Sequence, residues 1–343
     1  MRDAEVTIDG LPSPYTARAP EAEDGPEVLA LMEAHQRAAK GSASVDLEAV
    51  LGQLVGLGSW TRRQALVHDA DGRLAGWVSV HDRAAGRTLV EVTVSPELHR
   101  PTGEAIASAL FSAVDRYAHE IASLRSLETT LLDSGCYAPD ERQQAFLSAA
   151  GYRHTRTWLQ MTRPVTPEEA TSLPAPKPGV TVRSLDRHVD NGLPVAQDLQ
   201  AVHRVLEESF QDHFSSYPES FPEFVTRLRE DPGHRWDHWW LATVETENGV
   251  EPAGAVIASV LGPDADGVEG SYVDYIGVHR RARGKGVAKA LLRAVIADTA
   301  RRGNNRVGLE VDDDSPTRAD ALYLDLGWVT DYKTQSWHRD LEI

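Results

Sequence analysis

The chain repeats one order of predicted elements, and this duplication limits the folds available to it. Residues 145–152, AFLSAAGY, match residues 321–328, ALYLDLGW, at an offset of roughly 180 residues. Solenoid repeats have periods of about 20 to 50 residues, so this offset indicates a duplicated domain. The length of 343 residues fits, because one hydrophobic core rarely serves so long a chain.

Residues 164–179 form the predicted boundary between the copies. The segment PVTPEEATSLPAPKPG contains five prolines and little that a core would bury. Proline-rich segments are extended and act as spacers, so we expect an exposed connector. The predicted organisation is a first domain at 1–163, the connector at 164–179 and a second domain at 180–343.

Strands and helices follow one another in a similar order in both copies, as apolar periodicity and turn residues indicate. The first copy has predicted helices at 26–40, 46–57, 105–124 and 141–150, and strands at 64–67, 74–80, 88–94, 126–132 and 153–161. The second copy has predicted strands at 180–185, 239–244, 253–261, 272–278, 306–311 and 328–341, and helices at 195–210, 285–302 and 317–326. Both copies therefore mix helices and strands.

The net charge of −17 argues against binding to nucleic acid or to an anionic membrane, and favours neutral or cationic partners. Cys136 is the only cysteine, so the sequence predicts neither an intrachain disulfide nor a cysteine-based metal site. The first thirty residues lack the apolar region of a signal peptide, and no apolar run approaches the ~18 residues of a membrane span. We expect a cytoplasmic protein.

A glycine-rich turn follows the strand predicted at 272–278 and precedes the long helix after it. Backbone N–H groups at a helix start are unpaired and carry the positive end of the helix dipole, which suits phosphate. Gly284 and Gly286 would let a phosphate approach the backbone closely, and Arg283 and Lys285 add positive charge. By itself, such a turn is equally typical of an ordinary connection that needs positive φ.

Two segments of the second copy resemble the signature motifs of one family. Residues 278–292, VHRRARGKGVAKALL, carry Arg-x-x-Gly-x-Gly/Ala at Arg283, Gly286 and Ala288. Residues 315–328, SPTRADALYLDLGW, are similar to Asn-Pro-Thr-x-Ala-x-x-Leu-Tyr-x-x-Leu-Gly-Phe. In this order and spacing they resemble the GNAT superfamily of N-acetyltransferases. The duplicated layout resembles the tandem GNAT proteins of high-GC bacteria, a group that includes mycothiol synthases.

This resemblance implies an α/β fold with mixed α+β sheets. It comprises two tandem GNAT folds, each with a central, mostly antiparallel sheet that contains a splayed strand pair and is flanked by helices. The resemblance also implies acetyl-CoA as acyl donor and an amine acceptor, and we expect no metal and a monomer or homodimer. The cofactor-binding residues that it implies are Ile276, Gly277, Val278, Arg283, Gly284, Lys285, Gly286, Val287, Ala288 and, where relatives often have asparagine, Ser315.

Tyr323 matches the tyrosine that acts as general acid in this family. A phenol can protonate the departing thiolate when it is hydrogen-bonded to it. The amine attacks the thioester directly in this family, so no covalent enzyme intermediate is needed, and the sequence contains no evident nucleophile motif. The alternative is that Tyr323 is a helix tyrosine packed on the core.

An amine that binds as an ammonium must also lose a proton. Asp274 shares a strand face with Tyr272, because strand side chains alternate, and it is the first candidate base, directly or through water. Glu310 and Asp312, at the end of the neighbouring strand, are the next candidates. We expect Phe214, Tyr272 and these two acids at the acceptor site. A structural or solvated role is the alternative for each acid.

The first copy has lost the same features. Residues 100–105, RPTGEA, align with the glycine-rich turn, but Pro101 removes one N–H donor and Glu104 adds a negative charge where phosphates would lie. Leu147 stands opposite Tyr323 and cannot donate a proton. We therefore interpret the first copy as structural or substrate-covering.

The sequence favours an enzyme that acetylates the primary amine of a small molecule, such as an amino sugar, an amino acid derivative, a peptide or an antibiotic. A protein N-terminus or lysine as acceptor, and a non-catalytic module that binds acyl-CoA, are the alternatives. An intact turn together with Tyr323 favours the enzyme, since a binding module needs no acid. The acceptor itself is left open.

Overall fold

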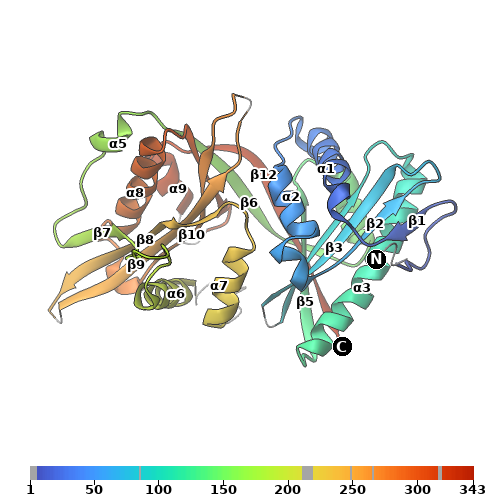
Figure 1. Ribbon diagram of the computed structural model, residues 1–343, viewed down its shortest axis with the longest axis horizontal. Coiled ribbons are helices and arrows are strands. Elements are labelled where there is room, and N and C mark those ends of the chain that lie inside the picture. The colour runs from blue at the N-terminus through green and yellow to red at the C-terminus, as the bar shows by residue number, and fades with distance from the viewer. Residues whose placement is uncertain (1–5, 85, 211–218, 248, 265, 316–318) are drawn as a thin grey trace. The chain divides into compact units, whose positions relative to one another are not determined.

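The computed structural model describes residues 6–84, 86–210, 219–247, 249–264, 266–315 and 319–343. The chain forms two compact units (Figure 1). Unit 1 comprises Met1–Trp158, Thr226–Pro232 and Tyr332–Ile343, and unit 2 comprises Leu159–Val225 and Gly233–Asp331.

The sheet of unit 1 has the strand order β1-β2-β3-β4-β5-β12. The strands are β1 (Thr16–Arg18), β2 (Arg62–His68), β3 (Leu74–Ala84), β4 (Arg87–Val94), β5 (Thr129–Tyr137) and β12 (Val329–Glu342). Neighbouring strands are antiparallel except β4 and β5, which are parallel. This sheet is mixed and mostly antiparallel, as the sequence predicts.

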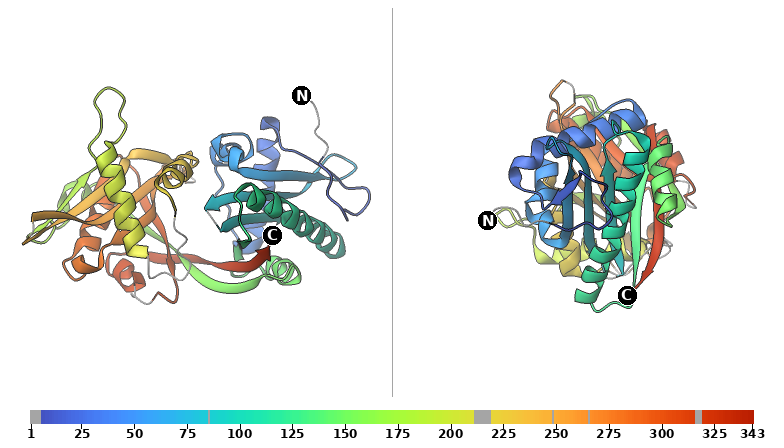
Figure 2. Two further views of the ribbon diagram at one scale, coloured as in Figure 1. Left: turned by 90° about the horizontal axis from the view of Figure 1, so that it is seen from below. Right: turned by 90° about the vertical axis from the view of Figure 1, so that its right-hand side faces the viewer.

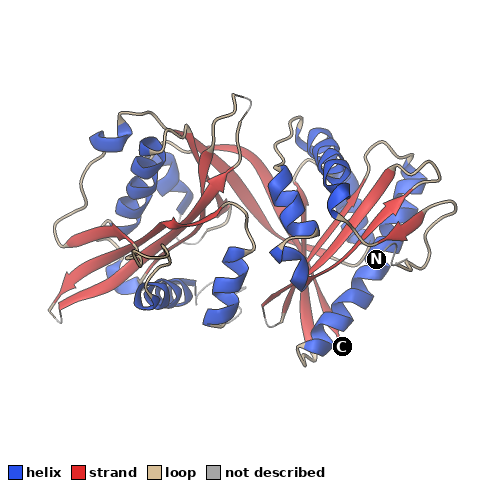
Figure 3. Cartoon of the chain, in the orientation of Figure 1, coloured by secondary structure: helices blue, strands red, loops and turns tan. Residues whose placement is uncertain are grey.

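Helices cover both faces of this sheet (Figure 3). They are α1 (Gly25–Lys40), α2 (Leu47–Leu54), α3 (Arg100–Leu124) and α4 (Glu141–Ala149), with short 3₁₀ turns η1 (Ala22–Asp24) and η2 (Leu57–Thr61). Leu66 and Trp77 pack on α1 and α2, whereas their chain neighbours Ala65 and Val78 belong to the core that α3 and α4 cover. Alternation of strand side chains therefore builds one core on each face.

The sheet of unit 2 has the order β6-β11-β10-β9-β8-β7. Its strands are β6 (Arg153–Pro164), β7 (Val180–Ser184), β8 (His234–Thr246), β9 (Gly249–Leu261), β10 (Gly270–Val278) and β11 (Arg306–Asp312). The remaining helices of the chain are α5 (Glu169–Ser172), α6 (Ala196–Phe210), α7 (Phe221–Arg229), η3 (Arg280–Ala282), α8 (Val287–Arg301) and α9 (Ala319–Asp325). A side chain at Gly277 would strike α6 and one at Gly254 would strike α8, so the two helices pack on opposite faces.

The last strand of each copy contributes to the other unit's sheet. Residues from Tyr332 onward belong to unit 1 and form the red strand that ends at the C-terminus in Figure 2. There β12 pairs with β5, and Trp337 lies opposite Ser134. Residues from Leu159 onward belong to unit 2, where β6 neighbours β11. Hydrophobic patterning identifies both segments as strands but does not state which sheet receives them.

Each unit contains a pair of parallel strands that separate after a short ladder. In unit 2, β10 pairs with β11 from Ser271 to Val273 only, although β10 continues to Val278. In unit 1, β4 pairs with β5 from Arg87 to Leu89 only. The predicted mixed α/β fold, with a splayed strand pair in each copy, is confirmed.

Several local features differ from the sequence predictions. Helix α3 begins at Arg100 rather than at residue 105, because Pro101 fits the first helical turn. The predicted connector contains α5, and Val165 within it is buried. No helix among the described residues combines the length and apolarity needed to cross a bilayer.

Candidate functional site

The glycine-rich turn of unit 2 presents an open helix start. After η3, Gly284 has φ 79° and Gly286 has φ 84°, both in the left-handed region that glycine tolerates. Gly286 is the N-cap of α8 and offers no capping side chain, so the N–H groups of the first turn lack that partner. Backbone groups in this arrangement form a cradle for anions. We call residues 283–288 the cradle.

Charged side chains surround the cradle. Arg283 and Lys285 are exposed, as a phosphate site requires. Further along α8, the ammonium of Lys289 is 2.5 Å from Asp325. Ala288 is half-buried, and Val287 is buried in the core, so Val287 has only its backbone available to a ligand.

The strand before the cradle has a backbone edge that β11 leaves unpaired. Ile276 and Val278 lie beyond the last β10–β11 pair, Val273 with Leu309, while their other edge pairs with β9. Gly277 has a packing role: a Cβ there would lie 2.9 Å from side-chain atoms of both Leu206 and Ser209 on α6.

Tyr323 lies on α9 and is almost fully buried, at 6% exposure. Its ring approaches that of Trp328, with ring centroids 6.0 Å apart. Burial raises the pKa of Tyr323 to about 12, so the phenol keeps its proton at neutral pH. Tyr323 is part of the hydrophobic core of unit 2, which accommodates its ring. Because the phenol retains its proton, it can serve as a general acid.

Asp274 stands at a β-bulge, where the β9–β10 register shifts between Val273 and Tyr275. The Ser259 hydroxyl donates to Asp274 Oδ1 over 3.2 Å. Ser259 also lies opposite Tyr272 in the register, so Asp274 and Tyr272 face the same side of the sheet. Bulges are frequent beside active sites because they redirect a side chain.

The acids on β11 differ from each other. Glu310 is exposed and accepts a hydrogen bond of 3.0 Å from the Gln160 amide. Asp312 is buried, and its Oδ1 accepts the backbone N–H of Asp314 at 3.0 Å. The Asp312 carbonyl accepts the N–H of Ser315 at 3.1 Å, so Asp312 shapes the turn that leads to Ser315.

Phe214 lies outside the described residues. Tyr272 lies against β11, since a Cβ at Gly308 would be 3.0 Å from the Tyr272 ring. In the part of the chain that the structure describes, no group of three His, Cys, Asp or Glu side chains is placed to hold a metal ion.

Unit 1 has filled the equivalent positions with its own atoms. Gly103, the counterpart of Gly286, lies within α3, and its N–H bonds the His99 carbonyl at 3.0 Å. Two α4 side chains form hydrogen bonds with backbone carbonyls at the splayed end of β4. Gln143 Nε2 donates to the Val92 carbonyl over 2.9 Å, and Arg142 Nη1 donates to the Ser95 carbonyl over 2.9 Å. The sequence analysis missed both residues, although the alignment of α4 with α9 places Ala319 opposite Gln143.

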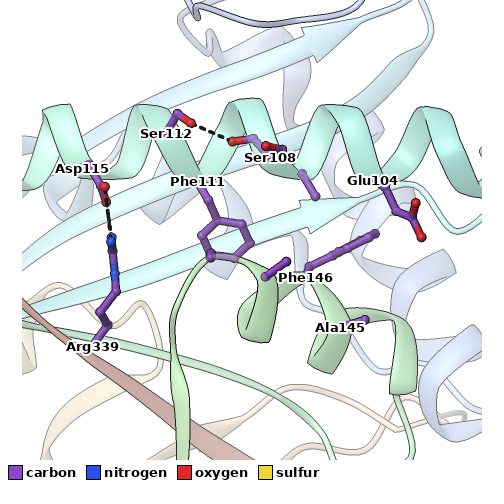
Figure 4. A pocket seen from close by; sticks show the side chains of 11 residues that line it. Glu104, Ser108, Phe111, Ser112, Asp115, Ala145, Phe146 and Arg339 are labelled. Carbon is purple, nitrogen blue, oxygen red and sulfur yellow. Dashed lines mark hydrogen bonds and ion pairs between the residues drawn. The ribbon is translucent and has the colours of Figure 1, made fainter.

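A pocket of about 360 Å³ also lies in unit 1, between α3 and α4 (Figure 4). Phe111 and Phe146 form its apolar floor, and Asp115 and Arg339 pair at one end. Glu104 at the other end pairs with Arg100 at 2.8 Å. The charges are neutralised within the protein, so the pocket shows no preference for an ionic ligand.

Burial also removes the single thiol from consideration as a nucleophile. Cys136 on β5 is buried, and this raises the pKa of its thiol to about 12. A thiol with that pKa supplies almost no thiolate at neutral pH.

The second copy matches a family model described as the acetyltransferase (GNAT) family, over residues 199–328. The chain is similar to a protein named mycothiol acetyltransferase from Salinispora arenicola, with 31% identity over 275 residues that cover 77% of each protein. It is also similar to a protein of the same name from Stackebrandtia nassauensis, with 28% identity over 323 residues, or 92% of this chain and 95% of that protein.

Two solved structures share the fold over both copies. A GCN5-related N-acetyltransferase from Sphaerobacter thermophilus superposes with a TM-score of 0.73 and 24% identity, covering 97% of this chain and 98% of the other. A tandem GNAT protein from the clavulanic acid biosynthesis pathway gives a TM-score of 0.64 and 18% identity, covering 95% and 98%. At these identities the likeness shows the fold alone.

Proposed function

The chain belongs to the GNAT family of acetyltransferases, and from this premise we propose that its acetyl-CoA site lies in unit 2, at the cradle. The protein is an acyltransferase that transfers an acetyl group from acetyl-CoA to an amine of a small molecule. The division of the chain into a degenerate domain at 1–163, a connector at 164–179 and a catalytic domain at 180–343 belongs to this proposal.

One observation carries the assignment of the site. The backbone edge of Ile276 and Val278 leads directly to the two left-handed glycines and the uncapped start of α8. A strand edge can pair with the amides of a pantetheine arm as it would with another strand, and a helix start accepts a diphosphate. Unit 1 uses the equivalent groups internally, at Gly103 and Val92.

The residues of unit 2 also supply the proton transfers that the reaction requires. When bound, acetyl-CoA provides a thioester whose carbonyl carbon the amine attacks. Asp274 would accept the proton that the ammonium loses, directly or through water. Tyr323 would donate its phenolic proton to the sulfur as the C–N bond forms and the C–S bond breaks. The nitrogen loses its second proton to solvent as the amide forms, and both residues return to their starting states by exchange with solvent.

For the acceptor, we propose a mycothiol-type small molecule. The two relatives described above carry the name mycothiol acetyltransferase, and each aligns with more than three quarters of this chain. Carboxylates at Asp274, Glu310 and the exposed Asp313 favour an acceptor that arrives as an ammonium. We expect the reaction in the cytoplasm, where acetyl-CoA is available.

Thiol release from acetyl-CoA tests the function. The amine panel contains des-acetyl mycothiol, glucosamine, free amino acids and a lysine-containing peptide. We expect turnover with des-acetyl mycothiol well above the rate of hydrolysis. Turnover with the peptide alone would replace the small-molecule acceptor by a protein one. If no amine is acetylated while acetyl-CoA binds, the chain is a binding module.

The role of Tyr323 is tested by Tyr323→Phe, with Tyr332→Phe as a matched control outside the site. Loss of a general acid typically costs about 10²- to 10⁴-fold in rate, so kcat should fall by at least ~100-fold in Tyr323→Phe. The Kd of acetyl-CoA should change less than about twofold, because the ring remains. Equal rates for the two variants would remove Tyr323 from the mechanism.

A further inference from the structure

Lys177, in the predicted connector, lies against the cradle. A Cβ at Gly286 would be 3.1 Å from Cδ of Lys177, 3.3 Å from Cε and 3.5 Å from Cγ. The methylene groups of Lys177 therefore lie over the backbone of Gly286, the N-cap of α8. A side chain in this position carries its ammonium to the rim of the cradle.

The segment that carries Lys177 is fixed at its first end. Arg163 Nε donates to the Leu326 carbonyl at 2.6 Å, and Arg163 Nη1 donates to Glu169 Oε2 at 3.0 Å. Ala170 and Leu173 then pack on the core of unit 2. The connector is therefore held against the domain that contains the cradle.

The segment is also fixed at its second end, next to the lysine. The N–H of Val180 donates to the Lys177 carbonyl over 3.0 Å, which closes a turn in which Gly179 has φ 78°. Val180 is buried and begins β7. Pro176 and Pro178 restrict the backbone on either side of Lys177. The backbone of this exposed lysine is therefore already ordered before a ligand binds, which reduces the entropic cost of binding.

The electrostatic setting indicates what Lys177 is for. The start of a helix carries partial positive charge, so a lysine there is repelled unless an anion is also present. Two nearby cations have protein partners: Lys289 pairs with Asp325 at 2.5 Å, and Arg281 pairs with Glu251 at 3.4 Å. The side chains of Arg283 and Lys285, in the cradle, form no ion pair with any residue that the structure describes. For the Lys177 ammonium, no hydrogen bond or ion pair occurs with any residue that the structure describes.

We infer that Lys177 binds the diphosphate of the coenzyme, together with the helix start of α8. This inference rests on the proposed coenzyme site. It makes the connector part of the donor site, because its lysine closes the cradle over Gly286. The diphosphate is the group expected there, since the Lys177 methylenes lie against the N-cap glycine itself.

Calorimetric titration of the full chain with CoA, dephospho-CoA and pantetheine tests the inference. The variant Lys177→Met keeps the methylene packing and removes the charge, and Lys333→Met is the control on an exposed lysine of β12. We expect Lys177→Met to weaken CoA and dephospho-CoA by the same factor, about 3- to 10-fold, and pantetheine not at all. The factor should shrink as salt is added, because the site is open to solvent.

The possible results separate the inference from the function on which it rests. If the wild-type chain fails to bind CoA, the proposed coenzyme site is wrong. If wild type binds CoA and Lys177→Met binds it equally well in low salt, only the role of Lys177 is refuted. An effect on CoA that vanishes with dephospho-CoA would place Lys177 at the 3′-phosphate and overturn the diphosphate assignment.

Discussion

Helices α3 and α8 follow equivalent strands, yet they start differently. In unit 1 the helix begins at Arg100, and Gly103 is an ordinary helical residue whose N–H is already bonded. In unit 2 the aligned residues form a turn with two left-handed glycines, and α8 begins about one helical turn later, at Val287. A glycine at the aligned position is therefore not enough to form a phosphate cradle, because the backbone N–H groups around it must also be unpaired.

The strands before these helices differ in the same way. Gln143 and Arg142 bond the splayed end of β4, and the Gln143 amide is buried at the Val92 carbonyl. Ala319, opposite Gln143 in the alignment, has no group that could bond β10. Arg318, opposite Arg142, lies outside the described residues. Unit 1 thus uses side chains of its own at the positions where we propose that unit 2 binds the coenzyme.

The largest effect is expected from a charge placed in the cradle. Gly286→Glu forces a left-handed non-glycine residue, which costs about 1–2 kcal/mol, and adds repulsion of the phosphates. We expect acetyl-CoA to bind at least about 100-fold more weakly, as measured by calorimetry against one site per wild-type chain. Gly103→Glu is the matched variant, and its Kd should stay within about twofold of wild type. A loss of binding in Gly103→Glu alone would assign the site to unit 1.

A smaller effect is expected when the Gln143 side chain, which bonds β4 in unit 1, is copied into unit 2. In Ala319→Gln, the new amide should compete for the β10 edge as Gln143 competes for β4. We expect about tenfold weaker binding of acetyl-CoA, which corresponds to one hydrogen bond of about 1.4 kcal/mol. Ala145→Gln, at an exposed position of α4, should bind acetyl-CoA like wild type. Equal affinities for the two variants would show that the edge of β10 is not used.

Removal of the Gln143 amide from unit 1 should lower the free energy of unfolding and leave acetyl-CoA binding unchanged. Gln143→Ala leaves the Val92 carbonyl without its side-chain donor, which costs about 1–3 kcal/mol for a buried group. Urea denaturation followed by circular dichroism should show an earlier midpoint. Ser148→Ala, at an exposed position of the same helix, should shift the free energy of unfolding by less than about 0.5 kcal/mol. Gain of a second acetyl-CoA site in Gln143→Ala would contradict our interpretation of unit 1.

The smallest effect is expected from alkaline pH. The pKa of Tyr323 is raised to about 12, so its acid form persists, and kcat should rise to a plateau without a fall up to about pH 10. Leu147 gives unit 1 no such group. The raised pKa stabilises the fold below about pH 10, and this contribution is lost as pH rises through the folded value of about 12. A decline of kcat near pH 9, absent from Tyr323→Phe, would show that Tyr323 titrates far lower.

Patterning predicted the features that depend on local sequence. The apolar spacing of residues 195–210 predicted α6, observed at Ala196–Phe210, and the helix predicted at 285–302 is α8, observed at Val287–Arg301. The glycines of the cradle were singled out because a residue without a Cβ lets a phosphate approach the backbone closely, and both also have the positive φ that glycine tolerates. The family and the fold followed from two short motifs near the start of helices.

Features that depend on tertiary contacts were not predictable. Nothing local indicates that Asp312 is turned into its own loop, or that Lys177 reaches Gly286 from a proline-rich segment. Helix α7 lies in a segment for which the sequence predicted no element. Helix α5 has four residues, which is too short for apolar periodicity to reveal. The partner of a strand is equally hidden, since β12 has the same alternation whichever sheet receives it.

Strands β6 and β12 each contribute to the sheet of the other unit, and this affects the order in which the two units can finish folding. Residues 332–343 leave the ribosome after the rest of unit 1 and after unit 2, yet they complete the sheet of unit 1 beside β5. Until then β5 has an open edge, which is a template for wrong partners. Unit 1, whose synthesis starts before that of unit 2, therefore completes its sheet only after unit 2 has been synthesised, and it depends on the second copy for its last strand.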